Sequence, residues 1–363
     1  MAVIVVEDDR VLRLLQVLLD PAAPQERGAA YADYVAHDLA DFEAWRASAR
    51  SRLARLFPAS VRMVATEEEL RAQLHEADAL VVESLGVSER ELAAAGRLVL
   101  VHKFGMIADN VDLAACARRR VTVRTLRRRT NIAVAEHTLA LMLALAKQIH
   151  RLNGKVSVER LQEAGYAYRK YDTRHTGANN YGRVGGLRLL RGMALGLLGM
   201  GEIGREVAGL ARVFGMNVLY HQRRRLPRED ETKFGIDYRA FADLFADSDV
   251  VSIHVPLAPD TRRLVDRAAL QRMKPGAWLI NNSRAEVIER AALIEALESG
   301  KLGAAGLDVH YQEPCAAADP LMKFENVILT PHYAGGPRST LLDDIEEVAL
   351  GVQQALAARG KAA

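Results

Sequence analysis

The stretch Gly199-Met200-Gly201-Glu202-Ile203-Gly204 decides the fold of this chain. It follows an apolar strand candidate at 193–198 and opens a helix candidate at 202–213. In a loop of this spacing the first glycine allows a tight turn, the second lets a pyrophosphate approach the backbone, and the third lets helix and strand pack closely. The free amides and the positive end of the helix dipole then hold the anion. The pattern predicts a dinucleotide-binding loop, and a glycine-rich turn of an unrelated α/β protein is the alternative.

Short β-branched runs alternate with helical patterns on both sides of this loop, which is typical of parallel sheets with crossover helices. Strands are expected at 2–6, 61–64, 80–82, 98–102 and 121–124, and then at 193–198, 216–221, 250–254, 278–281, 303–309 and 327–330. A long helix is expected over 133–150, an irregular segment over 166–186 and a closing helix over 339–358. The 363 residues suit two domains of about 150 residues each. We therefore predict an α/β protein with two doubly wound parallel-sheet domains.

An insert lies between the first two expected strands. Apolar residues recur there at spacings of three and four, namely Phe42, Trp45, Ala49, Leu53 and Leu56. This spacing predicts an amphipathic helix within 41–56, which Pro58 stops. Its apolar stripe is interpreted as a packing surface, within the monomer or between subunits.

Composition narrows the class of protein. Half of the residues are apolar and 26% are charged, which excludes wholesale disorder. The net charge of +3 is too small for a dedicated nucleic-acid binder, although arginine triplets occur at 118–120, 127–129 and 223–225. Two cysteines form neither a disulfide framework nor a Cys-rich zinc site, and no signal peptide or membrane span is visible. We expect a soluble, cytoplasmic protein with no metal site and neither a nucleic-acid nor a membrane partner.

The turn after the next expected strand selects the cofactor. An acid at this turn binds the ribose 2′-hydroxyl of NAD, but Gln222 stands there, and Arg223, Arg224 and Arg225 follow. A neutral amide followed by guanidinium groups attracts a 2′-phosphate, through charge-assisted hydrogen bonds worth roughly 1.5–3 kcal/mol each. The turn therefore predicts NADP(H) as the preferred cofactor and NAD(H) as the second choice. A solvated basic turn with mixed cofactor use is the alternative.

Three residues near predicted strand ends suit hydride transfer to a carbonyl. Arg284 follows the strand at 278–281, Glu313 lies beyond 303–309 and His332 follows 327–330. A guanidinium clamps a carboxylate and polarises a ketone, and an imidazole donates a proton near neutral pH. A carboxylate on the other imidazole nitrogen orients the ring and favours its charged form. Each residue alone is equally well explained as a surface Arg, a solvated Glu or a His at a strand end. The hypothesis therefore rests on the occurrence of all three after the dinucleotide loop.

At these residues the sequence resembles the D-isomer-specific 2-hydroxyacid dehydrogenases. The matching segments run from Leu98 to Gly335: Lys103-Phe104-Gly105 with Asp109-Asn110-Val111-Asp112, Ala133-Val134-Ala135-Glu136-His137, Gly199–Gly204, His254-Val255-Pro256-Leu257 with Thr261, Met273-Lys274-Pro275-Gly276 through Asn282-Ser283-Arg284, Gly306-Leu307-Asp308-Val309 with Glu313-Pro314, and Thr330-Pro331-His332. The resemblance implies that Arg284, Glu313 and His332 are the catalytic Arg, Glu and His. A Glu at 313, where the related formate dehydrogenases have Gln, argues against formate as the substrate.

The resemblance also implies binding residues and a domain plan. Asp308 would lie by the nicotinamide and Pro256 and Thr261 on the adenosine side, with Ser283 also among the cofactor-binding residues. The backbone near Met106 and Ile107, together with Arg284, would meet the substrate carboxylate. A flavodoxin-like substrate domain would span 1–137 with 333–363 returning to it, and a Rossmann domain would span 138–332. The active site would lie in the cleft between them, usually in a homodimer.

Some positions depart from the pattern of the family. Ala285 and Ile107 replace glycines, and Tyr311 stands where the family often has an acid. Arg127-Arg128-Arg129 replaces a common Pro-Gly turn, and is interpreted either as a solvated run or as the mark of an anionic or unusual substrate. The insert at 41–56 and the loop at 166–186 exceed the usual core. The sequence therefore predicts the type of reaction more closely than the identity of the substrate.

The leading hypothesis is an NADPH-dependent, reversible reduction of a 2-oxoacid to a D-2-hydroxyacid, with a substrate like glyoxylate or hydroxypyruvate. A cofactor-sensing binding protein of the same fold is one alternative, and a dehydrogenase for a bulky or phosphorylated 2-hydroxyacid is another. An NAD-dependent phosphoglycerate-type enzyme would need an acid where Gln222 stands. The intact Arg, Glu and His disfavour the binding protein.

Overall fold

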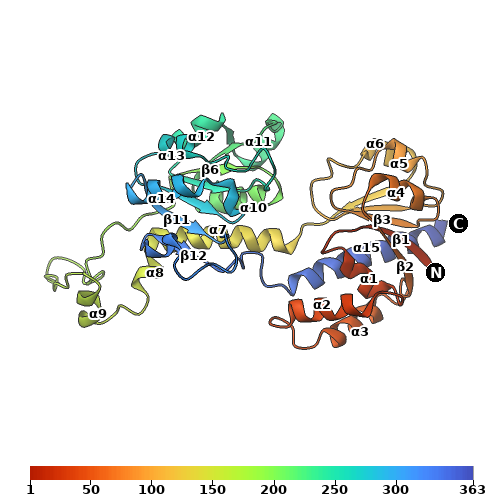
Figure 1. The fold of residues 1–363 in the computed structure, drawn as a ribbon, viewed down its shortest axis with the longest axis horizontal. Coiled ribbons are helices and arrows are strands. Elements are labelled where there is room, and N and C mark those ends of the chain that lie inside the picture. Colours follow the sequence, from red (N-terminus) through yellow and green to blue (C-terminus); the bar gives the residue numbers. More distant parts are fainter. Residues whose placement is uncertain (363) are drawn as a thin grey trace. The chain divides into compact units, whose positions relative to one another are not determined.

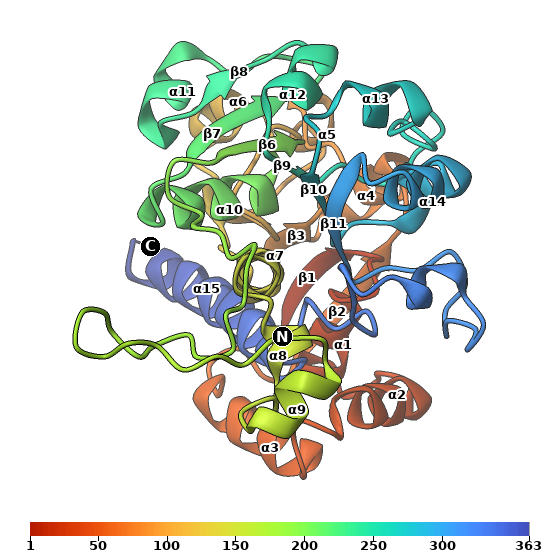
Figure 2. The same cartoon turned by 90° about the vertical axis from the view of Figure 1, so that its left-hand side faces the viewer.

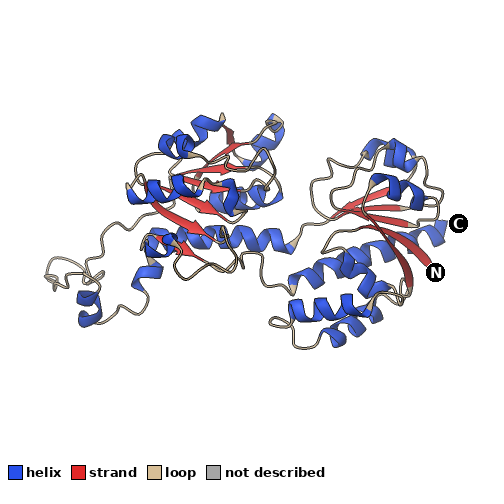
Figure 3. Cartoon of the chain, viewed as in Figure 1, coloured by secondary structure: helices blue, strands red, loops and turns tan. Residues whose placement is uncertain are grey.

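The chain folds into two units, each built around one parallel sheet (Figure 1). The computed structural model describes residues 1–362. Unit 1 comprises residues 1–133 and the segment from Gly335 onward, and unit 2 comprises Val134–Ala334. Helices cover both faces of each sheet (Figure 3), which confirms the predicted α/β class with two doubly wound parallel sheets.

Unit 1 has a sheet of five parallel strands in the order β2-β1-β3-β4-β5, the flavodoxin-like order. Its strands are β1 (Ala2–Glu7), β2 (Ala59–Val64), β3 (Ala79–Val82), β4 (Leu100–Lys103) and β5 (Thr122–Thr125). Its helices are α1 (Arg13–Leu19), α2 (Gln25–Val35), α3 (Phe42–Arg52), α4 (Glu67–Leu74), α5 (Glu89–Leu92), α6 (Leu113–Arg118) and α15 (Thr340–Ala362). All five strands expected in this part of the sequence are present.

The two faces of this sheet have separate cores. Helices α1, α2, α3 and α15 cover one face, and α4, α5 and α6 cover the other (Figure 1). Alternation along β1 explains this division, because Ile4 and Val6 face the first core and Val5 faces the second. The insert between β1 and β2 belongs to the first core. In that core Phe42, Ala49, Leu53 and Leu56 are buried with residues of α15, so the apolar stripe packs within the unit.

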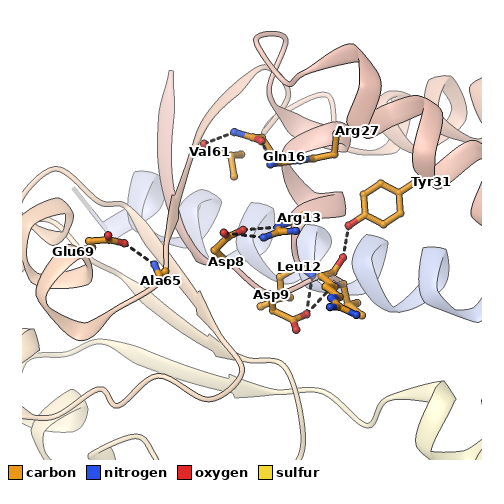
Figure 4. Close-up of polar contacts among 12 residues, drawn as sticks. Asp8, Asp9, Leu12, Arg13, Gln16, Arg27, Tyr31, Val61, Ala65 and Glu69 are labelled. Atoms are coloured by element: carbon orange, nitrogen blue, oxygen red, sulfur yellow. Dashed lines mark hydrogen bonds and ion pairs between the residues drawn. The ribbon is translucent and has the colours of Figure 1, made fainter. Parts of the chain in front are cut away.

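The turn after β1 is held by two acidic side chains. Asp9 Oδ1 accepts hydrogen bonds from the backbone amides of Val11 (2.7 Å) and Leu12 (3.2 Å). Asp8 accepts two hydrogen bonds from the Arg13 guanidinium, at 2.6 and 3.0 Å (Figure 4). The acidic run after β1 therefore ends the strand and begins α1.

Unit 2 has seven parallel strands in the order β12-β11-β10-β9-β6-β7-β8. They are β6 (Ala194–Leu198), β7 (Asn217–His221), β8 (Asp237–Tyr238), β9 (Val250–Ile253), β10 (Ala277–Asn281), β11 (Leu302–Leu307) and β12 (Val327–Leu329). The helical elements are α7 (Arg129–Lys147, which begins in unit 1), α8 (Ile149–Leu152), α9 (Val158–Glu163), α10 (Glu202–Val213), α11 (Arg228–Phe234), α12 (Phe241–Asp247), α13 (Arg267–Arg272), η1 (Ala285–Val287), α14 (Arg290–Glu298) and η2 (Pro320–Lys323). Apolar residues of α7 and α10 pack on one face of the sheet, and those of α12, α13 and α14 pack on the other (Figure 2).

The strand order of unit 2 reverses at β6. The chain runs outward from β6 through β7 to β8, then returns to β9 on the other side of β6 and continues to β12. Ligands of open α/β sheets bind beyond the carboxyl ends of the strands at such a reversal. The loop Gly199–Gly204 lies at this place.

Two local features differ from the sequence-based expectation, and a third agrees with it. The short edge strand β8 was not predicted, since two residues are too few to show alternation. Helix α7 begins at Arg129 rather than at residue 133, because Asp344 and Glu347 pair with the guanidinium that would otherwise oppose the helix dipole. The segment 166–186 has no helix or strand, as expected, and extends from unit 2 as an excursion after α9 (Figures 1 and 2). No helix within residues 1–362 is long and apolar enough to cross a membrane.

Candidate active site

The glycine loop after β6 has the geometry that a dinucleotide needs. Gly199 has φ +106°, and a Cβ there would lie 2.8 Å from the carbonyl oxygen of His254. A Cβ on Gly204 would lie 2.4 Å from the Gly199 oxygen, so a side chain would push helix and strand apart. A Cβ on Gly201 would meet nothing within 4 Å, which leaves the backbone open to a ligand. A side chain is thus excluded at Gly199 and Gly204 by nearby backbone atoms, whereas the absence of a side chain at Gly201 leaves space for a ligand.

The N-terminus of α10 faces this opening. Gly201 is the N-cap residue and offers no side chain to the first amides, while Glu202 and Ile203 begin the first turn. Amides without a side-chain cap, at the positive end of a twelve-residue helix, attract an anion. The structure therefore provides a backbone cradle that fits a pyrophosphate.

The arginines of the basic turn after β7 differ in their contacts. Arg225 donates to both oxygens of Glu231, at 2.7 and 2.8 Å, and Tyr220 donates to the same carboxylate at 2.8 Å. The Arg225 guanidinium lowers the pKa of Glu231 to about 2, against the opposing effect of burial. Arg225 is thus committed within the unit. Arg223 and Arg224 are exposed, and Gln222 donates to the Arg224 carbonyl oxygen at 2.6 Å.

The loop after β9 meets this turn. Its turn is closed by Thr261, whose Oγ1 donates to the Pro256 carbonyl at 2.6 Å and accepts from the Ala258 amide at 2.7 Å. Asp260 in this loop pairs with Arg223 at 2.7 Å. Pro256 and Thr261 therefore lie on the side of the site where Arg223 lies, beyond the ends of β9 and β7, the two strands that flank β6. Asp260 is a residue of this corner that sequence reasoning missed.

Arg284 leaves β10 in a turn that buried Asn281 holds. Asn281 donates to the Arg284 carbonyl at 2.9 Å and accepts from the Ser283 amide at 3.0 Å. Ser283 Oγ in turn donates to the Val255 carbonyl. The Arg284 side chain is exposed, whereas Ala285 is buried and its methyl group lies in the interior. The turn therefore presents a guanidinium at the carboxyl edge of the sheet.

Glu313 and His332 form a direct pair. His332 Nδ1 donates to Glu313 Oε2 at 2.7 Å, and the His310 amide donates to Glu313 Oε1 at 3.0 Å. Burial raises the pKa of Glu313, but these bonds outweigh it and lower the pKa below its usual value. Because a carboxylate only accepts, the Nδ1 atom carries the proton, and Nε2 is the nitrogen left for exchange with a substrate.

Asp308 anchors the loop that carries His332. Its carboxylate is fully buried and accepts from Thr330 Oγ1 at 2.6 Å, from the Tyr333 amide at 3.1 Å and from the Ala334 amide at 2.8 Å. His137 Nε2 lies 3.1 Å from Thr330 Oγ1 and 3.7 Å from Asp308. Burial lowers the pKa of His137, although the Asp308 charge opposes this. Sequence reasoning quoted these residues as motif members but did not foresee the network, since their polar contacts join segments far apart in the chain.

The structure brings together two of the three predicted catalytic residues. Glu313 and His332 touch, while Arg284 shares with them the carboxyl edge of the sheet, β10 being the neighbour of β11. Among residues 1–362, Arg284 makes no hydrogen bond or ion pair to either of them. A guanidinium, an imidazole and a carboxylate at one edge are the groups that carbonyl reduction requires.

Met106 and Ile107 lie in unit 1, just beyond β4 at the carboxyl edge of its sheet. Gly105 before them has φ +151°, a conformation that favours glycine, and Phe104 is buried. The Met106 side chain is exposed and that of Ile107 is half-buried. The loop is placed where ligands of such sheets bind.

A family model describes the nucleotide-binding part of this chain. The model of the D-isomer-specific 2-hydroxyacid dehydrogenases, NAD-binding domain, matches residues 139–334. This chain belongs to the D-isomer-specific 2-hydroxyacid dehydrogenase family. The resemblance drawn from the sequence motifs is thereby confirmed, and the chain is an oxidoreductase of the CH–OH group that uses a nicotinamide cofactor.

Named relatives of the D-2-hydroxyacid dehydrogenase family differ in substrate. A glyoxylate reductase of Aeropyrum pernix is 37% identical over 276 residues, which are 76% of this chain and 78% of that protein. A D-3-phosphoglycerate dehydrogenase of Archaeoglobus fulgidus is 32% identical over 77% of this chain, which spans only 49% of that protein. Among solved structures, a glyoxylate reductase from Paecilomyes thermophila is similar with a TM-score of 0.53 and 27% identity, covering 84% of this chain and 90% of that one.

The residues present fit the family's dinucleotide. The open space at Gly201, the uncapped amides of α10 and the carboxyl-edge position are what a pyrophosphate requires. Backbone atoms of Gly199–Gly204 would hold the pyrophosphate, and the turn after β7 with Pro256 and Thr261 would meet the adenosine. Ser283 and Asp308 lie at the strand ends beside Arg284 and Glu313, where the nicotinamide end would lie.

Proposed function

We propose that this chain catalyses the NADPH-dependent, reversible reduction of a 2-oxoacid to a D-2-hydroxyacid. The observation that carries the proposal is the 2.7 Å pair of His332 and Glu313 at the sheet edge that also presents Arg284. When bound, the cofactor supplies the hydride that goes to C2 of the substrate. The remaining chemistry belongs to the side chains.

Each side chain has a defined task. Arg284 would bind the substrate carboxylate in a bidentate manner and polarise the ketone oxygen, because a guanidinium stays charged at any working pH. His332 would donate the proton on Nε2 to that oxygen as it gains negative charge, and would take a proton back in the reverse direction. Glu313, ionised at low pH because its pKa is lowered, would stabilise the imidazolium and keep Nδ1 protonated. The amides of Met106 and Ile107 would bind the substrate carboxylate.

The preference for NADP(H) rests on the turn after β7. No carboxylate occupies the end of β7, where Gln222 stands, and Arg223 extends from it with its side chain 90% exposed. Asp260 would orient the Arg223 guanidinium through its 2.7 Å contact. A 2′-phosphate would gain charge-assisted bonds there. Equal KM values for NADPH and NADH in the wild-type protein would contradict this preference.

A spectrophotometric screen tests the proposed reaction. NADPH and NADH oxidation would be measured with glyoxylate, hydroxypyruvate, pyruvate, phenylpyruvate and phosphorylated 2-oxoacids. We expect the highest kcat/KM with NADPH and glyoxylate or hydroxypyruvate. Glyoxylate is the substrate in the name of the Aeropyrum pernix relative. Preferential turnover of a phosphorylated 2-oxoacid would instead support the phosphoglycerate-type substrate, which other relatives carry in their names. Tight cofactor binding with negligible turnover of every compound would support a cofactor-sensing protein.

We also propose that the chain acts as a homodimer in the cytoplasm. The family resemblance supports this assembly. Light scattering coupled to size-exclusion chromatography would measure the mass, and a monomer at micromolar concentration would contradict the dimer.

A further inference from the structure

His332 occupies a backbone conformation that needs support. Its φ is +52°, in the left-handed region that a residue with a Cβ adopts only when its surroundings hold it there. The imidazole direction follows from this backbone, so whatever fixes the turn Thr330–His332 also aims the ring. The contacts on the two sides of the turn therefore bear on catalysis.

The segment after His332 is held by Asp308. Two backbone amides, those of Tyr333 and Ala334, donate to the Asp308 carboxylate at 3.1 and 2.8 Å. These bonds fix the exit of the turn. At the entrance the same carboxylate binds only the Thr330 hydroxyl, at 2.6 Å, and the Thr330 carbonyl oxygen is bound by another side chain.

The entrance of the turn is held by His310. His310 Nε2 lies 2.8 Å from the Thr330 carbonyl oxygen, which also accepts from the His332 amide at 2.9 Å. Because a carbonyl only accepts, Nε2 of His310 carries the proton. The same residue donates its backbone amide to Glu313 Oε1 at 3.0 Å. One residue thus touches the carbonyl that shapes the His332 turn and the carboxylate that receives the His332 ring.

From this geometry we infer that His310 is a positioning residue for the proposed proton donor. Its ring joins the loop after β11 to the loop after β12, in parallel with the Glu313–His332 bond, and keeps His332 Nδ1 directed at Glu313. The inference rests on the proposed function for its kinetic consequence. Its structural consequence, a His332 ring locked with the proton on Nδ1, does not depend on which substrate is used.

Two substitutions of His310 separate the effect of its ring shape from the effect of its hydrogen bond. His310→Phe keeps a planar ring of similar size and removes the donor, whereas His310→Gln keeps an amide N–H that can reach a carbonyl oxygen. We expect kcat to fall by about tenfold in His310→Phe, the effect of one net hydrogen bond on a positioned group, with the cofactor Kd unchanged. We expect His310→Gln to recover kcat to within about threefold of wild type.

A matched control exists in the same unit. His150 Nε2 also contacts a backbone carbonyl, that of Glu325 at 3.1 Å, and this exposed histidine lies on α8. His150→Phe makes the same chemical change away from the strand ends that carry Arg284, Glu313 and His332. We expect it to leave kcat and KM unchanged.

A second measurement reads the ring itself without substrate. In isotope-labelled protein, the NMR chemical shifts of the His332 ring carbons report which nitrogen carries the proton in the neutral ring. The His332 signals are assigned by their absence from the spectrum of His332→Gln. The titratable side chains hydrogen-bonded around this turn include Asp308, His310 and Glu313 near β11, together with His137 on α7. We expect the Nδ1–H form to dominate in wild type and His310→Gln, and a mixture of both forms in His310→Phe.

The outcomes distinguish the inference from the proposed function. Unchanged ring shifts and unchanged kcat in His310→Phe would overturn the positioning role while leaving the reaction intact. Absence of turnover with every 2-oxoacid would overturn the proposed function, and the ring shifts would still decide the role of His310. Should His310→Phe fold poorly, His310→Leu would replace it as the variant without a donor: a mixture of the two ring forms would support the role, and an unchanged Nδ1–H form would overturn it.

Discussion

Arg225 and Glu231 form a two-point ion pair with bonds of 2.7 and 2.8 Å beneath the turn that follows β7. This pair gives one of three consecutive arginines a carboxylate partner within unit 2. The sequence showed three equal cations, whereas the structure assigns Arg225 to the fold and leaves Arg223 at the corner of the site with Asp260. Substitutions of Arg223 and of Glu231 test these two roles separately.

Arg223→Ala is expected to raise the KM for NADPH by about tenfold and to leave the KM for NADH unchanged. A charge-assisted hydrogen bond is worth about 1.5–3 kcal/mol, and the lower end applies because the side chain is highly exposed. Steady-state kinetics with both cofactors would measure the change. Arg272→Ala removes an exposed cation at the end of α13 and controls for net charge. A parallel rise in both KM values would contradict a role in recognising the 2′-phosphate.

Glu231→Gln is expected to destabilise the protein near neutral pH and to have less effect in acid. The folded-state pKa of about 2 lies below the ordinary value of 4.5 for a Glu side chain, so the ionised form stabilises the fold. That contribution is complete above the unfolded-state pKa and is lost as the pH falls from about 4.5 toward 2. Thermal unfolding of both proteins across this range would show Tm values that converge in acid. A constant Tm difference would refute the linkage.

Arg284→Ala is expected to lower kcat/KM by roughly 10²–10³-fold, since one group aimed at developing charge contributes about that much. Arg284→Lys restores the charge without the planar fork, so we expect it to recover only part of the loss. Kinetics with the best 2-oxoacid would measure both variants. Asn281 holds the turn, so unfolding curves for the Arg284 variants should match wild type, and an unchanged kcat/KM in Arg284→Ala would exclude the clamp.

His332→Ala is expected to lower kcat by about 10²–10⁴-fold, the usual contribution of a general acid. The cofactor Kd should stay the same, because the pyrophosphate cradle lies at the β6 end and does not include His332. Fluorescence titration with NADPH and single-turnover kinetics would separate the two effects. Wild-type kcat in this variant would show that another group supplies the proton.

Arg129→Ala is expected to destabilise unit 1 by about 2–3 kcal/mol. Burial raises the pKa of the Asp344 carboxyl, so without the guanidinium that now lies 2.7 Å away this group must either stay charged with no cation beside it or take up a proton, and both cost stability. The value is below that of a fully buried pair because Arg129 is partly exposed. Urea unfolding would measure it, with Arg118→Ala, whose partner Glu89 is exposed, as a control of small effect. Adding Asp344→Asn to Arg129→Ala should recover part of the loss, and no recovery would contradict a stranded charge.

The arginine run at 127–129 has contacts in the folded structure that its sequence pattern does not indicate. As sequence, it was either a solvated run or the mark of an anionic substrate. In the structure Arg129 pairs with Asp344 and Glu347 of α15, and Arg128 lies over the Phe104 ring with Glu83 at 3.6 Å. The residues that pair with Arg129 are more than two hundred positions away in the chain, so no local pattern announces them.

The two parallel-sheet units, the glycine loop and the strand-end positions of Arg284, Glu313 and His332 could all be predicted from the amino-acid sequence. These features depend on local periodicity and on the steric needs of glycine, both of which are visible in short windows of sequence. Three further facts required the folded coordinates: Arg225 pairs within the unit, Asp260 contacts Arg223, and His310 and Asp308 hold the turn of His332. Those contacts join loops that follow different strands, and hydrogen-bond geometry between such loops depends on how the strands are ordered in the sheet.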